Sequence, residues 1–251
     1  MKRNNQTGFT LVELLIVIGI IAVLVSILLP ALNKARQQAS TLRCLSTLRQ
    51  FQLYNQMYSM ENRNQYFPIL EQSPGYVFTA PTTSKVWSQE PVVRKFMQII
   101  PMNMAWDSEA QREYICNEAT YCLQAGGYNN GRYKIALSYG MNYTDWADPA
   151  DLSLWYAATP NQPAISYKAS RIRKPSEKIA WADAMGPWTR KASSNLYTGE
   201  ATGDGTRIAY RHQGGVNIAF FDGHAERLMR KEVDQNMLTT ARANALWYAY
   251  K

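Results

Sequence analysis

An unbroken apolar run near the start of the chain constrains its fold most strongly. It extends from Phe9 to Leu29, after a polar stretch that carries Lys2 and Arg3. At a rise of about 1.5 Å per residue, a helix over this run would span roughly 30 Å, the thickness of the bilayer core. Glu13 lies inside the run. Because a charged side chain in a membrane segment is costly and usually marks function, we expect this helix to do more than anchor the chain.

Two simpler interpretations of the apolar run account for it less well. A secretory signal peptide also has a charged start, but its apolar part is shorter and a small-residue cleavage site follows it. Here the helical pattern continues through ALNKARQQAS. A plain single-pass anchor fits the length but leaves Glu13 unexplained. Basic residues lie on both sides of the run, so the positive-inside rule does not fix its orientation.

The segment TGFTLVELLIVIGIIAVLVSILLPAL resembles the N-terminus of type IV prepilins and type II secretion pseudopilins. The resemblance implies cleavage between Gly8 and Phe9 by a prepilin peptidase/methyltransferase on the cytoplasmic face, and N-methylation of Phe9. Glu13 then matches the family's invariant acid, and Pro30 matches its helix-kinking proline. The resemblance also implies a single-pass inner-membrane protein with a cytoplasmic N-terminus and a periplasmic head, which later joins a fibre.

In such a fibre the charge of Glu13 has a physical explanation. Cleavage exposes an ammonium group on Phe9, and Glu13 can pair with it on its own chain or on a neighbouring subunit. Pairing inside a bundle of low dielectric offsets the cost of two lone charges and fixes the axial register of the subunits.

The chain divides into four predicted segments: a leader over 1–8, a transmembrane helix over 9–32, an extension of that helix over 33–62, and a globular head over 63–251. The extension is predicted because small or apolar residues recur at helical spacing with a polar back. They are Ala35, Ala39, Leu42, Leu45, Leu48, Tyr54 and Met57. The polar stretch ENRNQYFP is expected to end the helix.

This extension carries a second resemblance. RCLSTLRQFQLYNQMYSMENRNQYFP is similar to a segment shared by a large group of prepilin-like proteins with an extended head. The matching residues are Cys44, Leu48, Arg49, Gln50, Tyr58 and Pro68. Ser46 and Thr47 stand where that group has two asparagines, which is a departure from its pattern.

The head is predicted to be rich in β-structure after residue 134. KIALSYGMNY, EKIAWADAM and TRIAYRH are short β-rich runs bounded by turn residues. GVNIAFFDGHAERLM reads as a hairpin with a two-residue type I′ turn at Asp222 and Gly223. The final DQNMLTTARANALWYAYK reads as a short helix. The predicted fold is α+β, with the outer half of a long N-terminal helix packed on an antiparallel sheet, as in pilins.

His212, followed after nine residues by Asp222 and Gly223, resembles the H-X9-DG signature of the same prepilin-like group. SYGMN and KPSEKIAWADA are also similar to that group. His212, Asp222 and His224 are residue types that could form a metal or acid–base site. A strand of six residues would separate the first two by roughly 20 Å. The better interpretation is that Asp222 and Gly223 make the turn and His212 caps or packs the sheet, so no enzyme is predicted.

Two further sites are weaker expectations. Cys116 and Cys122 lie six residues apart and could form a disulfide in an oxidising compartment, or remain two small buried thiols. Major pseudopilins of type II secretion bind calcium in a head loop. The acidic loops here offer Asp145, Asp148, Asp151 and Asp204, although no fixed calcium spacing is matched.

The composition is typical of a folded protein, with 46% hydrophobic and 18% charged residues. The net charge is +8, and no block of five like charges suggests a nucleic-acid-binding tail. The resemblance implies a pilin or pseudopilin subunit that polymerises with other pilin-like subunits and works with the secretion or pilus assembly machinery. The alternative is a membrane-anchored binding module whose 16 tyrosines and 7 tryptophans stack on glycans, surfaces or DNA. An exposed aromatic row on the head would favour that alternative.

Overall fold

The computed structural model describes residues 10–71, 85–89, 93–95, 100–101, 108–124, 128–129, 132–147, 164–200 and 207–250. Its longest element is helix α1, Leu11–Glu61, which continues through Pro30. The chain forms two compact units, 1–39 and 40–251. The second unit therefore contains residues 40–61 of α1 together with the sheet structure.

A five-stranded sheet forms the centre of the second unit, in the order β10-β7-β9-β11-β12. Its strands are β7 (Tyr139–Asn142), β9 (Ile179–Asp183), β10 (Trp188–Thr189), β11 (Gly215–Phe220) and β12 (Ala225–Met229). The α+β class predicted from the sequence is confirmed. The sheet is mixed rather than purely antiparallel, because β10 pairs with β7 in parallel.

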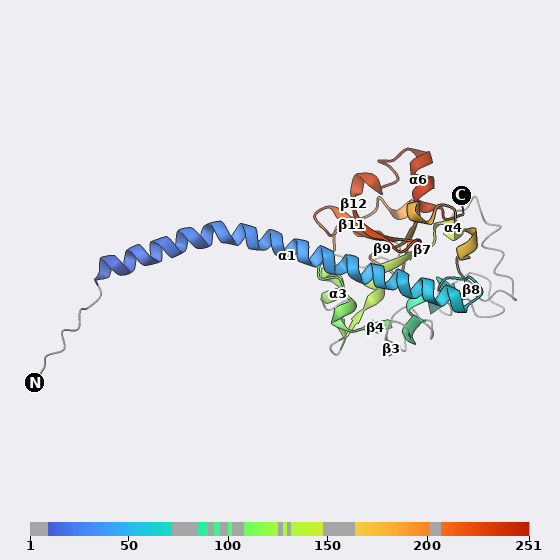
Figure 1. Cartoon of the computed structure of the whole chain (residues 1–251), viewed down its shortest axis with the longest axis horizontal. Coiled ribbons are helices and arrows are strands. Elements are labelled where there is room, and N and C mark those ends of the chain that lie inside the picture. Colours follow the sequence, from blue (N-terminus) through green and yellow to red (C-terminus); the bar gives the residue numbers. More distant parts are fainter. Residues whose placement is uncertain are drawn as a thin grey trace, which may run out of the picture. The chain divides into compact units, whose positions relative to one another are not determined.

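Both faces of this sheet are covered, as Figure 1 shows. One face packs on α1 around a cluster of aromatic rings, in which Phe51 lies 5.3 Å from Tyr139 and 5.6 Å from Trp181, centroid to centroid. The other face packs on α6, Thr240–Trp247, through a second cluster that includes Ile218 and Trp247. Because β11 is buried on both faces, all six of its residues are buried.

Short elements surround the main sheet. One small sheet joins β2 (Lys85–Val86), β1 (Leu70–Glu71) and β8 (Ala164–Ile165), and another joins β3 (Ile100–Pro101), β4 (Ser108–Ala110), β6 (Arg132–Lys134) and β5 (Tyr128–Asn129). The short helices are α3 (Thr120–Leu123) and α4 (Thr144–Ala147). Of the β-rich runs predicted, TRIAYRH contributes isolated bridges at Ile208 and His212 instead of a strand.

The buried face of α1 differs from the predicted stripe. Leu48 is buried as expected, but Leu42 and Met57 are 66% and 43% exposed. The side chains that face the head are Thr41, Cys44, Thr47, Leu48, Phe51, Gln52, Asn55 and Ser59. The prediction failed because polar residues on this face are buried with hydrogen-bond partners in the head, which a hydrophobic pattern does not register.

The hairpin turn also differs from the prediction. The loop between β11 and β12 contains Phe221, Asp222, Gly223 and His224, with the Gly223 N–H donating to the Phe220 carbonyl at 3.0 Å. Gly223 has φ +102°, but Asp222 does not lie in the left-handed region. A type I′ turn needs positive φ at both central residues. Asp222 and Gly223 therefore do turn the hairpin, but as part of a longer loop.

Candidate functional site

The N-terminal segment carries the first predicted site. Gly8 and Phe9 lie outside the described residues. Glu13 lies in the first turn of α1, where its carboxylate accepts the Thr10 N–H at 2.9 Å and the Thr10 hydroxyl at 2.7 Å. In return the Glu13 N–H donates to the Thr10 hydroxyl at 3.3 Å. This reciprocal pattern is a capping box, which satisfies donors at the start of the helix. The sequence TLVE contains the signal, and our sequence reasoning missed it.

The α1 segment that follows Glu13 is apolar on every side. Leucine, isoleucine and valine side chains from Leu11 to Leu29 are exposed all around the helix. By length and composition this helix can cross a membrane. A helix that is apolar all round must be surrounded by lipid or by other helices, so this segment needs partners outside its own head.

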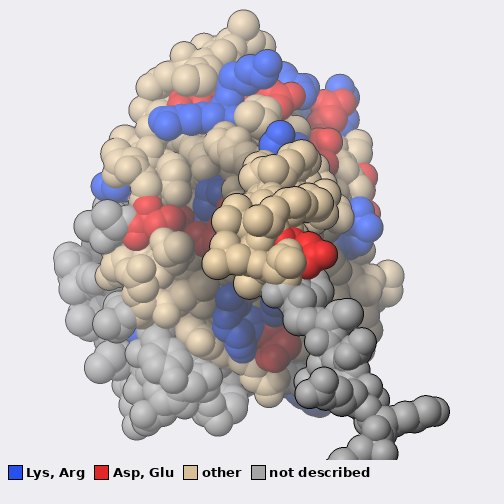
Figure 2. Space-filling model, turned by 90° about the vertical axis from the view of Figure 1, so that its left-hand side faces the viewer, with Lys and Arg blue, Asp and Glu red and all other residues tan. Residues whose placement is uncertain are grey.

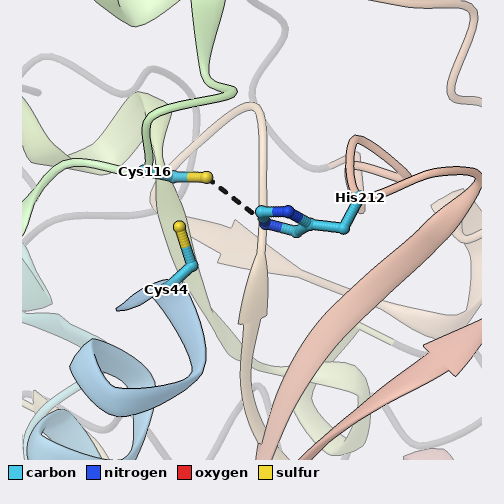
Figure 3. Close-up of side chains that lie close together, drawn as sticks. All are labelled: Cys44, Cys116 and His212. Carbon is cyan, nitrogen blue, oxygen red and sulfur yellow. Dashed lines mark hydrogen bonds between the residues drawn. The ribbon is translucent and has the colours of Figure 1, made fainter. Parts of the chain in front are cut away.

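The second predicted site is His212, and the structure places it against residues from distant parts of the chain. One of its ring nitrogens lies 3.3 Å from the Cys116 Sγ. The ligating atoms of Cys44, Cys116 and His212 all lie within 4.8 Å of one another, and all three residues are buried. Figure 3 shows the two thiols and the imidazole pointing toward one common point. Cys44 comes from α1, Cys116 precedes α3, and His212 precedes β11.

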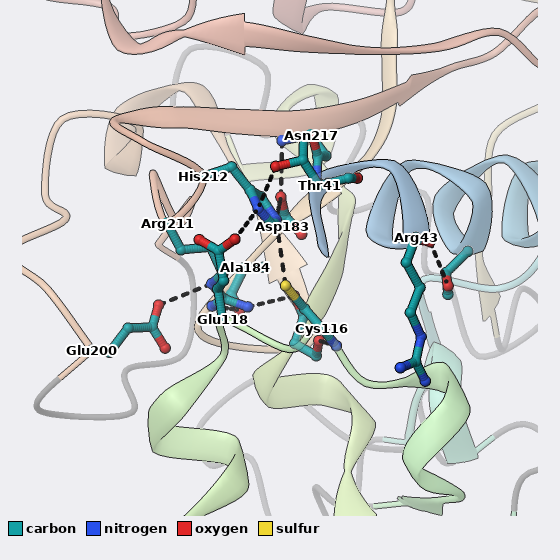
Figure 4. Close-up of polar contacts among 12 residues, drawn as sticks. Thr41, Arg43, Cys116, Glu118, Asp183, Ala184, Glu200, Arg211, His212 and Asn217 are labelled. Carbon is teal, nitrogen blue, oxygen red and sulfur yellow. Dashed lines mark hydrogen bonds and ion pairs between the residues drawn. The ribbon is translucent and has the colours of Figure 1, made fainter. Parts of the chain in front are cut away.

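Carboxylates hold both nitrogens of the His212 ring (Figure 4). Nε2 lies 3.2 Å from Asp183 Oδ2, and Nδ1 lies 3.2 Å from Glu118 Oε1. Burial lowers the pKa of His212, but the charge of Asp183 and the contacts with Asp183 and Cys116 outweigh it and raise the pKa to about 11. His212 is therefore a buried imidazolium at neutral pH, and it forms an ion-pair network inside the head.

Arg211 extends this network on the next residue. Its Nε donates to Glu200 Oε1 at 2.9 Å, and its terminal nitrogens donate to the carbonyls of Ser138 and Ala184 at 3.2 and 2.9 Å. The guanidinium is almost fully buried. Arg211 and His212 thus both have carboxylate partners, which buried charges require.

The other end of the H-X9-DG signature contacts α1. The Phe221 carbonyl, beside Asp222, accepts from Gln52 Nε2 at 2.9 Å and from Gln56 Nε2 at 3.2 Å. At the first end, the Thr41 hydroxyl lies 3.4 Å from His212 Nδ1. Thr41 and Gln52 are separated by roughly 16 Å along a helix. Strand β11 spans that distance. The residues at the two ends of the signature therefore contact α1 at two separate points, one before and one after the strand.

Gln52 is the central residue of the second contact, and its replacement is a testable prediction. Its Oε1 accepts from Trp181 Nε1 at 3.2 Å and from Asn55 Nδ2 at 3.1 Å, and all of these groups are buried. Gln52→Leu leaves those donors without an acceptor, so the free energy of unfolding should fall by about 1–3 kcal/mol. The matched control is Gln50→Leu on the exposed face of α1, where denaturant unfolding should detect little change.

Asp222 and His224 form a separate pair. His224 Nδ1 lies 2.6 Å from Asp222 Oδ1, and the side chains are 40% and 33% exposed. The structure does not bring His212 and Asp222 into one site, in agreement with the interpretation of the signature as structural. Asp183 and Glu118 were not predicted. Asp183 could have been noticed as a carboxylate at the end of the apolar strand IAWAD.

The predicted cysteine pair and calcium residues lie as follows. All three cysteines are free, and the Cys122 Sγ donates to the Lys134 carbonyl at 3.2 Å instead of meeting Cys116.

The carboxylate of Asp145 accepts from Tyr167 Oη, Ala249 N and Tyr250 N at 3.1, 2.7 and 3.3 Å, so protein donors occupy it. Asp148, Asp151 and Asp204 lie outside the described residues, and a calcium site stays a prediction.

The surface of the head bears on the binding-module alternative. Every aromatic side chain whose burial the structure describes is buried or half-buried, and Trp87, Trp181 and Trp247 are fully buried. Across the described residues on the face in Figure 2, blue Lys and Arg side chains lie among red Asp and Glu side chains. The described part of the head therefore uses its aromatic rings as core, which favours a scaffold.

Comparisons with known proteins agree with these features. The family model of the prokaryotic N-terminal methylation motif matches residues 3–29. The chain is similar to the type IV wide pilus major component PilA4 of Thermus thermophilus, with 42% identity over 61 residues, covering 24% of this chain and 47% of that protein. It is also similar to the type II secretion system core protein G of Klebsiella michiganensis, with 28% identity over 101 residues, covering 39% of this chain and 70% of that protein.

A third relative is the type II secretion system core protein G of Dickeya chrysanthemi, with 30% identity over 99 residues, covering 38% of this chain and 63% of that protein. No solved structure matches. The chain thus spans between about half and about two thirds of the length of these curated relatives. Together with α1, the matches indicate a membrane-anchored, single-pass protein. Residues 3–29 thus match the prokaryotic N-terminal methylation motif, and the N-terminal part of the chain is similar to a type IV pilus component and to type II secretion core proteins.

Proposed function

We propose that this protein is a structural subunit of a type II secretion pseudopilus or a type IV pilus-like fibre. A prepilin peptidase/methyltransferase removes residues 1–8 and methylates Phe9. The mature chain stays in the inner membrane, with its N-terminus in the cytoplasm and its head outside, until assembly machinery draws it into a fibre with other pilin-like subunits.

The observation that carries this proposal is the exposed apolar surface of α1. Leu11 is 77% exposed and Ile27 is 69% exposed, so the helix is covered by lipid before assembly and by other subunits afterwards. The apolar surface continues onto the head-proximal part of α1, where Leu42, Leu53, Met57 and Met60 are exposed. Helical spacing places these four side chains on one face. That face is suited to contact a neighbouring helix in the fibre.

Mass spectrometry of the chain extracted from membranes tests the processing step. We expect a mature N-terminus at Phe9 that carries one additional methyl group. A chain that retains Met1 in the membrane fraction contradicts the proposal. Protease treatment of spheroplasts tests orientation, since the head should be digested from outside while a cytoplasmic marker protein in the same cells stays intact.

A further inference from the structure

The buried cluster of Cys44, Cys116 and His212 brings two thiols together beside the ion pairs of the histidine. The two thiols come from segments far apart in the chain, yet their sulfurs and the His212 ring meet within 4.8 Å (Figure 3). Cys44 is 1% exposed, and Cys116 and His212 are 0% exposed. Two facing thiols isolated from solvent have two common fates, coordination of a soft metal ion or formation of a disulfide.

The surroundings of His212 favour the disulfide. A metal-binding histidine is neutral and gives one nitrogen to the ion. Here both ring nitrogens already face carboxylates, Asp183 at 3.2 Å and Glu118 at 3.2 Å, and these hold the ring as a cation. A divalent ion would have to displace that proton and sit beside the Asp183 contact. Although the Cys116 thiol also contacts His212, the Cys44 thiol is the group near it with which it can form a covalent bond.

We propose that Cys44 and Cys116 form a disulfide in the mature protein. This inference rests on the proposed function, because that function places the head outside the reducing interior of the cell. Two S–H bonds are lost and one S–S bond forms. The two electrons and the two protons pass to the disulfide of an extracytoplasmic thiol oxidase, whose S–S bond breaks to give two thiols.

The closed head determines when this reaction takes place. Burial, followed by contact with Cys44 and the charge of Asp183, raises the pKa of the Cys116 thiol well above its ordinary value. Since the thiolate is the reactive form, the thiol in the finished head is inert. The bond therefore forms while the segment around Cys116 closes on α1, and once formed it is shielded from reductants. Cys122, whose thiol contacts the Lys134 carbonyl, remains reduced.

Thiol mapping of the full chain tests the proposal. Cells are lysed in denaturant that contains N-ethylmaleimide, so that buried free thiols are also alkylated, and the protein is digested without reductant and analysed by mass spectrometry. We expect a Cys44–Cys116 cross-linked peptide and one alkylated thiol, at Cys122. Cys122→Ser should keep the cross-link, whereas Cys44→Ser should expose Cys116 to alkylation in the denatured chain. Alkylation of all three cysteines, a Cys116–Cys122 link, or stoichiometric zinc in the purified protein would overturn the proposal.

A second measurement separates this inference from the proposed function. The full chain, denatured and reduced, is refolded in detergent with a mixture of oxidised and reduced glutathione, which supplies the oxidant whatever the native compartment. Formation of the Cys44–Cys116 bond there supports the pairing, and its failure overturns it. The mature N-terminus is measured separately, on chain extracted from membranes. That measurement reports independently on whether the chain is processed as a pilin.

Discussion

Replacing His212 by glutamine should lower the free energy of unfolding of the protein by about 3–5 kcal/mol, the usual cost of breaking a buried ion pair. The reason is that Asp183 and Glu118 would keep their charges beside a neutral side chain, and Asp183 is fully buried. A loss of this size is a large fraction of the stability of a typical domain. Denaturant unfolding of the detergent-solubilised chain measures it.

The second histidine of the chain supplies the control. His224 pairs with Asp222 at the surface, so His224→Gln should change the free energy of unfolding by less than about 1 kcal/mol. The double variant His212→Gln, Asp183→Asn removes both charges and should recover part of the loss. Equal effects of the two single histidine variants would show that the network around His212 does not stabilise the head.

The ion pair between His212 and Asp183 makes the free energy of unfolding depend on pH. The pKa of His212 rises from about 6.5 in the unfolded chain to about 11 in the folded one. The folded state therefore binds its proton more tightly, and the contribution of His212 is complete below pH 6.5. It declines as the pH rises and is lost above about pH 11. The stability difference between wild type and His212→Gln should shrink steadily between pH 7 and pH 10 if the charge is responsible, and should stay constant if packing is.

Glu13→Leu should abolish fibre assembly while leaving insertion of α1 in the membrane intact. The apolar run needs no charge to enter lipid, and removing one favours insertion. In the proposed fibre, however, the ammonium of the processed Phe9 would lose its partner in a low-dielectric bundle, which is strongly unfavourable. Sheared fibre fractions, compared with membrane fractions by immunoblot, measure the two effects separately.

The variant Glu13→Gln distinguishes two roles that Glu13 could have in assembly, pairing through its charge and capping the start of α1. Glu13 accepts from Thr10 in a capping box, and glutamine can fill the same position of that motif. If pairing with the Phe9 ammonium drives assembly, the glutamine variant should fail as the leucine variant does. Fibres from Glu13→Gln together with none from Glu13→Leu would assign the residue to the cap and contradict the pairing hypothesis.

The features that the sequence predicted are those with a local signal. The apolar run, the α+β class, the end of α1 near residue 61 and the turn at Asp222 and Gly223 each depend on neighbouring residues. The buried face of α1 was predicted incorrectly because it includes Gln52 and Asn55. These side chains are polar, but they are buried with hydrogen-bond partners in the head. Their partners, Trp181, Phe221 and Phe67, lie in segments that α1 meets only in the folded head.

The cluster around His212 could not be predicted for a similar reason. Its members come from α1, from the segment before α3, from β9 and from the segment before β11. Spacing along the chain carries no information about such a meeting. The resemblance marked His212 as a signature residue. Asp183 stands out as a carboxylate at the end of an apolar strand, but its pairing and that of Glu118 with His212 became recognisable only from their positions around the ring.

Residues at both ends of β11 contact α1, and this limits where the protein can tolerate insertions and deletions. Residue spacing in a strand has period two, so one added or removed residue turns every later side chain to the opposite face. Between His212 and Gly223, such a change would separate the imidazolium from its carboxylates or move the Phe221 carbonyl away from Gln52. Length variation among related chains should therefore collect in the surface loops of the head and spare the nine residues between the histidine and the aspartate.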